Sequence, residues 1–349
     1  MFRYVVGAAI VSACVAAQVP ESGSNERPAG TAAVVKTVVS TEMSTLPRGI
    51  VRAEAAAGAG LAAAYPGDFG IRENKAVLFT EDFDGADGLK AWSDRKGDVR
   101  ITESGMHGTR GLAITADLRD GGNNGGHLFK RLPYGEDAVW CRFYVKFKKP
   151  HDYVGRLVSL TGDVPAEPVP YRGDGICPDG NARFFTSVEP FGFGGAVPQP
   201  GAWRMLSYWC EMEMDRTDNK YWGNGCSSTK PLAAREDAWT CVEMLVRMNT
   251  TPNARDGEQA FWIDGKPVAA FEGFRWRTSR SLAVNGVWLN YFMSAVSATR
   301  QGSKTPADTS TVEFDDIVVA KSYIGPKIDP APPAAPETPS RDEATPEKK

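Results

Sequence analysis

Two strongly alternating segments carry the side chains best able to do chemistry. Residues 139–148 and 238–249 alternate between two kinds of side chain, a period of two that places successive residues on opposite faces of a β-strand. If the apolar faces form a core, the opposite faces of these and shorter strands should line one exposed surface. We predict that this surface contains Trp140, Arg142, Tyr144, Lys146, Arg183, Ser187, Glu189, Trp209, Glu211, Glu213, Asp215, Trp239, Glu243, Arg247 and Asn249.

The mixture of residue types on this predicted surface is typical of a sugar-binding site. Flat aromatic rings stack on the apolar face of a sugar, while Arg and carboxylate side chains bind its rim of hydroxyls. Solvent-facing strands more often carry Thr, Lys, Glu and Ser than repeated Trp and Tyr. The sequence therefore predicts a polysaccharide, anionic or neutral, as the partner. The alternative is a plain solvated face on which charges pair across neighbouring strands.

The composition agrees with a globular β-protein. The chain has 349 residues, of which 42% are hydrophobic and 24% charged, and its formal net charge is −3. These values exclude a disordered or multi-span membrane chain, and the small net charge gives no drive to bind nucleic acid. Many turn residues (36 Gly and 24 Pro) and 10% aromatic residues favour strands. Together with a hairpin signal at Asp264-Gly265, they predict an all-β fold, an antiparallel two-sheet β-sandwich.

The two ends of the chain differ from this β-rich middle. Residues 1–17 hold a short apolar run that predicts an export signal, and Val11-Ser12-Ala13-Cys14 resembles a lipobox, with ordinary secretion as the alternative to lipidation of Cys14. Residues 18–73 predict an Ala/Gly/Ser-rich tether, and residues 326–349 a Pro-rich disordered tail. Residues 74–325 then form one domain of a protein that is secreted or held at the cell envelope.

Several segments of the C-terminal half resemble a known family. They are Trp239-Thr-Cys-Val-Glu243, Arg247-Met-Asn249, Asp256-Gly-Glu258, Phe261-Trp-Ile-Asp-Gly265, Asn290-Tyr-Phe292 and the stretch from Phe314 to Gly325. These segments resemble the concanavalin A-like lectin/glucanase jelly roll and, within it, the alginate and glucuronan lyase-like branch of polysaccharide lyase family 14. The resemblance implies a jelly roll that binds a polysaccharide, either as a lyase of a uronate polymer or as a non-catalytic glycan-binding module.

The resemblance also implies candidate catalytic residues. The lyase pattern has a Gly-Lys-Leu segment where this chain has Gly155-Arg156-Leu157, a Ser-x-Arg strand where Arg183 remains, and a Tyr-x-Tyr strand where only Tyr208 remains. Lyase chemistry needs a cation that neutralises a uronate carboxylate and a Tyr or His that moves a proton. Arg156, Arg183 or Arg142 would supply the cation. Because alternation turns Tyr208 toward the core, Tyr144 is the predicted proton-transferring residue.

A hydrolase is the alternative enzyme. Glu211, Glu213 and Asp215 alternate along one predicted strand, which would place three carboxylates on one face about 6–7 Å apart. This arrangement is similar to the acidic strand of laminarinase-type glycoside hydrolases, in which crowded carboxylates supply an acid and a nucleophile. The other interpretation is a charged strand end that runs into the polar loop 216–220.

Two further predictions concern structural support. Asp84 opens the domain and Asp316 closes it, so their carboxylates could share a structural Ca²⁺ with loop carbonyls; no cofactor is required for the chemistry. Cys210 and Cys226 flank a loop and are the preferred disulfide pair of an exported protein.

Overall fold

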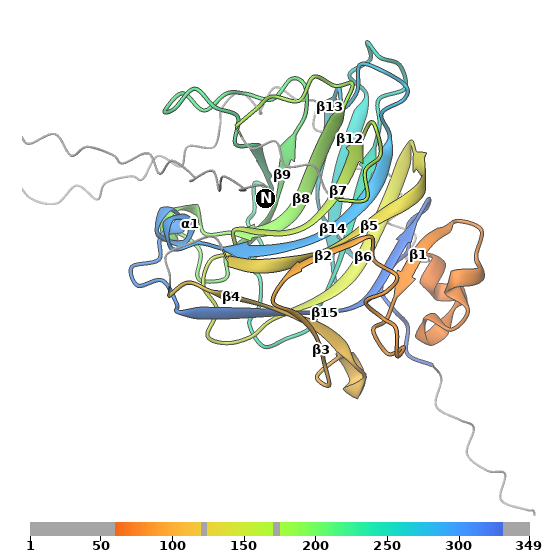
Figure 1. The fold of residues 1–349 in the computed structure, drawn as a ribbon, viewed down its shortest axis with the longest axis vertical. Helices are drawn as coiled ribbons and strands as arrows, with labels where there is room; N and C mark the ends of the chain where they lie inside the picture. The colour runs from red at the N-terminus through yellow and green to blue at the C-terminus, as the bar shows by residue number, and fades with distance from the viewer. Residues whose placement is uncertain (1–59, 120–123, 170–174, 331–349) are drawn as a thin grey trace, which may run out of the picture. The chain divides into compact units, whose positions relative to one another are not determined.

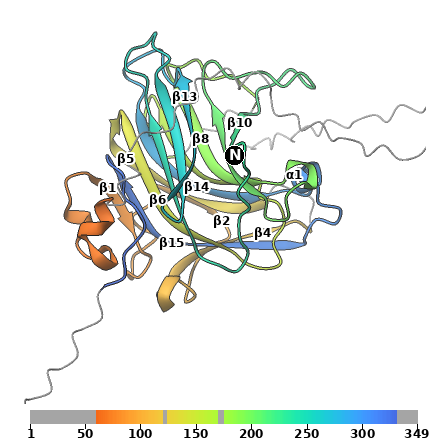
Figure 2. The ribbon, with the colours of Figure 1, turned by 180° about the vertical axis from the view of Figure 1, so that it is seen from behind.

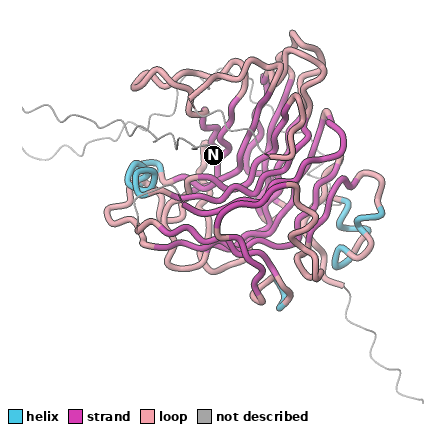
Figure 3. The backbone as a smooth tube through the Cα atoms, in the orientation of Figure 1, coloured by secondary structure: helices cyan, strands magenta, loops and turns pink. Residues whose placement is uncertain are grey.

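Strands are the main regular structure in the chain that can be described. The computed structural model describes residues 60–119, 124–169 and 175–330, and Figure 3 shows many strands joined by loops, with little helix. Helical turns are short: one α-helix, α1 (Ala295–Gln301), and 3-10 turns at Leu61–Ala64, Pro66–Asp68, Ile71–Glu73, Met106–Gly108 and Phe193–Gly195 in the described part. No helix among these residues has the length and apolar character needed to cross a membrane.

Two antiparallel sheets pack face to face, as Figures 1 and 2 show from opposite sides. Sheet A has the strand order β13-β12-β11-β6-β15-β4-β3, with β1 also paired to β15. Its strands are β1 (Val77–Glu81), β3 (Val99–Thr102), β4 (Gly111–Asp117), β6 (Ala138–Phe147), β11 (Thr240–Arg247), β12 (Gly257–Ile263), β13 (Lys266–Phe274) and β15 (Thr309–Ala320).

Sheet B has the strand order β10-β9-β8-β7-β14-β5-β2. Its strands are β2 (Asp94–Gly97), β5 (Asn124–Glu136), β7 (Arg156–Asp163), β8 (Arg183–Phe191), β9 (Ala202–Tyr208), β10 (Asn224–Ser227) and β14 (Val284–Met293). Strands far apart in sequence, such as β7 and β14 or β6 and β15, lie side by side. The predicted all-β jelly-roll sandwich is confirmed.

The predicted apolar faces form the core between the sheets. Val139, Phe143 and Phe147 of β6 are fully buried, and the Phe147 ring lies 5.9 Å from the ring of Trp203 on β9 in the opposite sheet. Each such side chain stabilises the fold by about 1.5–3 kcal/mol through its burial. The hairpin at Asp264-Gly265 also forms, with φ angles of 49° and 72° that suit the turn between β12 and β13.

The outer face of sheet A is covered by two segments that we call the terminal segments, residues 60–73 and 321–330. They are joined by hydrogen bonds from Leu61 N to Tyr323 O (3.1 Å) and from Ala62 N to Ile324 O (2.9 Å). Together with Trp140 and Trp262, apolar residues of these segments form a second apolar cluster outside the main core. The prediction that residues 60–73 belong to a tether is therefore wrong, because their apolar side chains pack on the sheet.

Candidate active site

The predicted sugar-binding surface is divided between the two outer faces of the sandwich. The β6 and β11 residues do share one face, since Arg142 is paired in register with Glu243 on sheet A. Arg183 and Glu189, however, lie on β8 in sheet B. Because the outer faces of the two sheets point away from each other, the prediction of one continuous surface is wrong.

Arg142 lies beneath the terminal segments rather than in an open cleft. Its side chain is fully buried and forms an ion pair with Asp68, and its guanidinium donates to Gly325 O at 3.3 Å and to Asp316 O at 3.2 Å. Burial alone would lower the pKa of Arg142, but hydrogen bonds and charge from Asp68 raise it above its ordinary value. Arg142 was predicted to bind a sugar; instead, its ion pair with Asp68 holds residues 60–73 against the sheet.

Tyr144 and Glu243 hold the other terminal segment. The Tyr144 hydroxyl accepts a hydrogen bond from Lys327 N at 2.9 Å, and burial raises the pKa of Tyr144 well above its ordinary value. The Glu243 carboxylate accepts bonds from Ile324 N (2.8 Å) and Gly325 N (2.9 Å), and burial raises its pKa to about 7. The predictions that Tyr144 moves a substrate proton and that Glu243 binds a sugar are wrong, because the chain itself occupies both groups.

The remaining predicted residues on β6 and β11 are paired with their neighbours. Arg247 forms an ion pair with Glu258 at 2.5 Å, and its guanidinium carbon lies 5.6 Å from the ring centre of Trp140. Lys146 pairs with Glu313 at 2.5 Å. On sheet A the charges therefore pair across neighbouring strands, as the alternative to a sugar-binding surface predicts. These residues do not form a sugar site.

Two other predicted residues lie in the interior. Trp209 is buried, and its ring centre lies 5.1 Å from that of Phe274. Asn249 is fully buried, and its amide donates to Arg277 O at 2.9 Å. Both were predicted to contact substrate, and both instead fix the ends of strands to the core.

The acidic run after β9 does not form a strand face. β9 ends at Tyr208, and Glu211 pairs with Arg255 at 2.7 Å. Glu213 is exposed, and Asp215 accepts a hydrogen bond from Thr217 N at 2.7 Å within a turn. The predicted hydrolase arrangement of three carboxylates on one strand face is therefore wrong, whereas the substrate contacts of Glu211 and Glu213 stay predictions.

The predicted calcium site does not fit the residues present. Asp84 accepts a hydrogen bond from Arg110 N at 2.8 Å, and both oxygens of Asp316 lie 2.9 Å from the ammonium of Lys327. Lys327 thereby supplies the positive charge that Asp316 needs. The described residues contain no group of three or more His, Cys, Asp or Glu side chains that could hold a metal ion.

The cysteines of the described chain are free thiols. Cys210 Sγ lies 3.0 Å from Arg275 O, whereas Cys226 is buried in the core and is paired in register with Met205. The predicted Cys210–Cys226 disulfide is therefore wrong, since the two side chains have different surroundings.

The outer face of sheet B carries a group of charges that we call the cationic cluster, Arg156, Glu189 and Arg204. Arg156 Nη1 lies 3.5 Å from Glu189 Oε2, and Arg204 Nη2 lies 3.0 Å from Glu189 Oε1. The guanidinium of Arg204 also stacks 3.4 Å from the ring centre of Phe191. Burial lowers the pKa of Arg204, and Glu189 partly offsets this effect, so the group stays protonated. Two guanidinium groups thus meet at one carboxylate on this face, and guanidinium groups are the side chains best suited to bind an anionic group.

Tyr208 lies on the same face as the cationic cluster. It is paired in register with Phe185, the two rings stack at 4.3 Å, and the guanidinium carbon of Arg156 lies 5.8 Å from the Tyr208 ring centre. Trp203 and Met205 pack between the sheets, and Ser207 Oγ donates to Gln259 Oε1 of the opposite sheet at 2.9 Å, so Tyr208 lies on the other side of β9. The prediction that Tyr208 points between the sheets is wrong, although its ring is buried among apolar neighbours.

Polar side chains also lie in the middle of this face. Ser159 is paired in register with Trp288 on one side and Ser187 on the other. The hydroxyls of Ser159 and Thr161 are buried and have no hydrogen-bond partner among the described residues. Buried polar atoms without partners are costly, which favours a ligand or water that completes their bonding.

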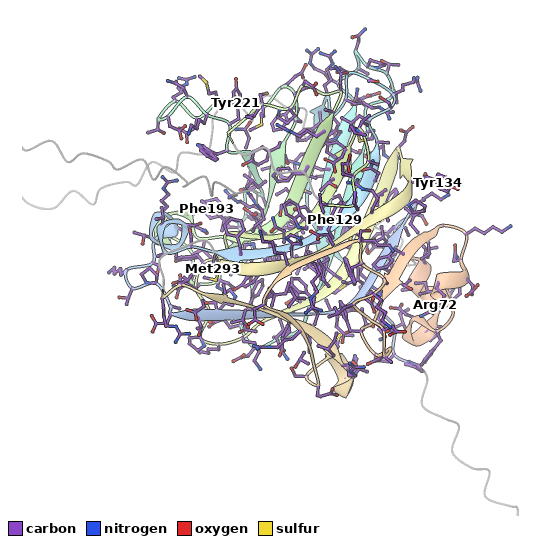
Figure 4. All side chains as sticks on the ribbon, in the orientation of Figure 1. Arg72, Phe129, Tyr134, Phe193, Tyr221 and Met293 are labelled. Atoms are coloured by element: carbon purple, nitrogen blue, oxygen red, sulfur yellow. The ribbon has the colours of Figure 1, made fainter. Side chains whose placement is uncertain are left out.

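A His–Asp pair lies on the same face at the β5 side. His127 Nε2 lies 2.7 Å from Asp94 Oδ2, and the imidazole packs edge-on against Trp288 with 5.7 Å between ring centres. Phe129, labelled in Figure 4, is the next residue of β5 on this face. Sequence reasoning missed His127 because the Gly-rich run 121–126 before it indicates a loop. In the structure, His127 belongs to β5, which begins at Asn124.

Arg183 does not join Arg156. It is paired in register with Asp163 at the far end of β7, seven positions from Arg156, which corresponds to about 23 Å along the strand. Arg131 forms an ion pair with Asp163 at 3.1 Å. Of the three predicted catalytic residues, Tyr144, Arg183 and Arg156, only Arg156 lies in the cationic cluster.

Arg204 was missed by the sequence analysis. The predicted strand that carries Glu211, Glu213 and Asp215 was not extended back to Arg204, whereas β9 spans Ala202–Tyr208. The signal was present, since Arg204 is the polar residue between the apolar Trp203 and Met205.

The fold and this face define a class: a jelly-roll sandwich with a cationic, partly unsatisfied polar surface on one sheet. A family model described as polysaccharide lyase 14 matches residues 209–314, and the chain resembles that family over this segment. No curated protein sequence matches the chain.

Solved structures share the fold. An alginate lyase from Chlorella virus has a TM-score of 0.51 and 15% identity, with 70% of this chain and 99% of that chain covered. A polysaccharide lyase 14 alginate lyase from Aplysia kurodai has a TM-score of 0.51 and 13% identity over the same shares of the two chains. An endo-β-1,4-glucuronan lyase from Trichoderma reesei has a TM-score of 0.48 and 12% identity, covering 70% and 95%.

Proposed function

We propose that this protein is an exported polysaccharide lyase that cleaves a uronate-containing polysaccharide by β-elimination on the outer face of sheet B. The observation that carries the proposal is the cationic cluster. Arg156 and Arg204 approach the carboxylate of Glu189 from two sides on this face, at 3.5 and 3.0 Å. A uronate carboxylate is the anion that such a site would bind in an acidic polysaccharide.

The chemistry requires that the substrate carboxylate be neutralised first. Charge stabilisation by guanidinium groups lowers the pKa of the proton on C5 and favours the carbanion-like transition state. A base then removes that proton, the electron pair forms the C4–C5 double bond, and the glycosidic C4–O bond breaks. A proton delivered to the leaving oxygen completes the reaction.

Tyr208 is the proposed proton-transferring residue. Its ring lies beside Arg156. Tyr208 is also the one Tyr of the lyase family's Tyr-x-Tyr pattern that this chain keeps. The His127–Asp94 pair is a second proton carrier on the same face, held in orientation by its 2.7 Å contact.

The family resemblance supports the reaction class and the substrate class. The matched model is of polysaccharide lyases, and the two structures with TM-scores above 0.5 are alginate lyases. Alginate and glucuronan are therefore the substrates to test first. Export is supported by the apolar signal in residues 1–17 and the lipobox-like Cys14, which lie outside the described residues.

A non-catalytic glycan-binding module is the second candidate. It is favoured by the small exposed fraction of Tyr208, 2%, which limits the approach of a sugar to its hydroxyl. The same cationic cluster would then bind an acidic polysaccharide without cleaving it.

One experiment separates these functions. The purified protein is incubated with alginate, with glucuronan and with a neutral β-glucan, and the ultraviolet absorbance of unsaturated uronate ends is followed. We expect the absorbance to rise with at least one uronate polymer and not with the glucan. Binding of a uronate polymer without any rise in absorbance would overturn the lyase and leave the binding module.

A further inference from the structure

The loop between β9 and β10, residues 211–223, extends over the outer face of sheet B. Gly223 has a φ of +87°, and a Cβ atom there would lie 2.5 Å from the Tyr208 ring and 3.1 Å from the Leu206 side chain. Both of these side chains belong to the outer face. Only glycine permits this close approach, so the chain passes directly over the β9 side of the face.

The loop is held in a defined position by backbone hydrogen bonds. Asp215 N donates to Lys220 O at 2.7 Å, and Gly175 and Tyr221 exchange bonds of 3.0 and 3.3 Å. The bonds with Gly175 connect the loop to the chain between β7 and β8. In Figure 4 Tyr221 lies at one end of the β8 and β9 strands, and Phe193 lies near α1 at the other end.

Trp222, the residue before Gly223, is exposed and yet oriented. It keeps 41% of its surface exposed, while its indole Nε1 donates to Asp218 Oδ2 at 2.7 Å. The ammonium of Lys220 lies 5.7 Å from the centre of its ring. The polar edge of the indole is thus satisfied within the loop, and its flat apolar surface remains available.

We propose that Trp222 and Lys220 form a second sugar subsite, which stacks a pyranose ring on the indole and pairs the carboxylate of that sugar with the Lys220 ammonium. The chemistry fits an acidic sugar, because a flat apolar ring and an adjacent cation match the apolar face and the charge of a uronate. Since the ring is already oriented by Asp218, binding loses little side-chain entropy. The identity of the ligand rests on the proposed function.

The position of this subsite sets a length requirement. Arg204, at one end of the cationic cluster, and Tyr208, beneath Gly223, are four residues apart on β9, or about 14 Å, and Arg156 lies between them, 5.8 Å from the Tyr208 ring centre. A sugar chain with a carboxylate bound at Arg204 must exceed a disaccharide in length to reach Trp222 as well. The subsite therefore strengthens the binding of long chains and contributes nothing to a disaccharide bound at Arg204.

The test compares binding of full-length alginate and glucuronan with binding of their disaccharides, by titration calorimetry. We expect Trp222→Ala to raise the dissociation constant for the polymer about three- to tenfold, as the loss of one aromatic contact predicts, and to leave that for the disaccharide unchanged. Trp222→Phe, which keeps a flat ring, should recover part of the polymer affinity. Lys220→Met should weaken polymer binding and reduce its dependence on salt concentration.

Tyr134→Ala is the matched control, because Tyr134 is an even more exposed aromatic residue, at 78%, on β5. Equal polymer affinity of Trp222→Ala and the wild-type protein would overturn the subsite, as would an equal loss in Tyr134→Ala. Polymer binding that depends on Trp222 without any cleavage would support the subsite and refute the lyase. Cleavage with a KM unaffected by Trp222→Ala would do the reverse.

Discussion

The two outer faces of the sandwich carry similar residue types and treat them differently. On sheet A, Arg142 and Glu243 are covered by the terminal segments. Arg142 forms an ion pair with Asp68, and the carboxyl group of Glu243 accepts hydrogen bonds from two backbone N–H groups. On sheet B, Arg156 and Arg204 both contact the carboxylate of Glu189, and neither of the terminal segments lies over them. The first arrangement serves to attach the chain's own segments, whereas the second is the one we propose for a ligand.

This difference teaches that the residue types of a strand face do not by themselves make a binding site. Aromatic, basic and acidic side chains can attach a protein's own ends as well as they bind a sugar. What separates the two faces is whether the chain supplies the partners. On sheet B the buried hydroxyls of Ser159 and Thr161 have no hydrogen-bond partner among the described residues, but on sheet A the same is true of Arg142 Nε and Trp262 Nε1. The covering segments and not the unsatisfied atoms therefore distinguish the two faces.

Removing one tyrosine hydroxyl from each outer face should give the largest difference in activity between the two sheets. Tyr208→Phe should lower kcat on a uronate polymer by roughly 10²- to 10⁴-fold, the usual size of lost acid–base catalysis. Tyr144→Phe should leave kcat unchanged and cost about 1 kcal/mol of stability, because it removes only the bond from Lys327 N. Initial rates from the absorbance of unsaturated ends and urea unfolding measure both effects. A natively stable Tyr144→Phe protein without activity would place the chemistry on sheet A.

A pair of arginines tests the same contrast through charge. Arg156→Gln should lower kcat/KM by about 10²- to 10³-fold, since it removes a group that stabilises the developing negative charge. Arg247→Gln should alter it less than twofold, because Arg247 is paired with Glu258 on sheet A. The rates of both variants are compared at saturating and limiting substrate. Comparable losses in the two variants would show that the charge of the whole molecule, and not the cationic cluster, governs activity.

The structural role of sheet A predicts a loss of stability instead of activity. Asp68→Ala should destabilise the protein by about 3 kcal/mol, because it leaves the fully buried guanidinium of Arg142 without its ion-pair partner. The matched change Asp87→Ala breaks an exposed pair with Lys90 and should cost under about 1 kcal/mol. Urea unfolding at pH 7 measures the difference. Similar midpoints for the two variants would mean that residues 60–73 contribute little to the fold.

The sequence was sufficient for the fold class and for the two faces of the two strongly alternating segments. Alternation in residues 139–148 and 238–249 assigns their buried and outward sides correctly, and Asp264-Gly265 forms the predicted hairpin. These features depend on local backbone geometry, which a short segment determines by itself.

The site could be predicted only in part, because its assembly depends on contacts between distant segments. Alternation cannot say which sheet a strand joins, so Arg142 and Arg183 were assigned to one surface although they lie on different sheets. It also cannot foresee that residues 60–73 cover one of the two faces. The strand that holds Tyr208 was predicted to continue through Glu211, Glu213 and Asp215 with these carboxylates facing outward. Because β9 ends at Tyr208, the residues after it do not continue its alternation, and Tyr208 was turned inward.

The smallest predicted effect tests whether Glu243 serves only to attach the chain. Burial raises its pKa from 4.5 to about 7, so between these pH values the folded state binds more protons than the unfolded state. The free energy of unfolding must then fall as the pH rises through this window. Relative to Glu243→Gln, the wild-type protein should lose about 1–3 kcal/mol of stability between pH 5 and pH 7.5.

The comparison with Glu243→Gln isolates this carboxyl group, because Asp315, whose pKa burial also raises to about 7, is present in both proteins. Urea unfolding at the two pH values provides the measurement, and Glu103→Gln, at an exposed position, should show no pH-dependent difference from wild type. If the wild-type protein instead gained stability over the variant as the pH rose, the bonds from Ile324 N and Gly325 N would be stabilising an ionised Glu243. The outer face of sheet A would then hold its terminal segment by charge and not by a buried neutral acid.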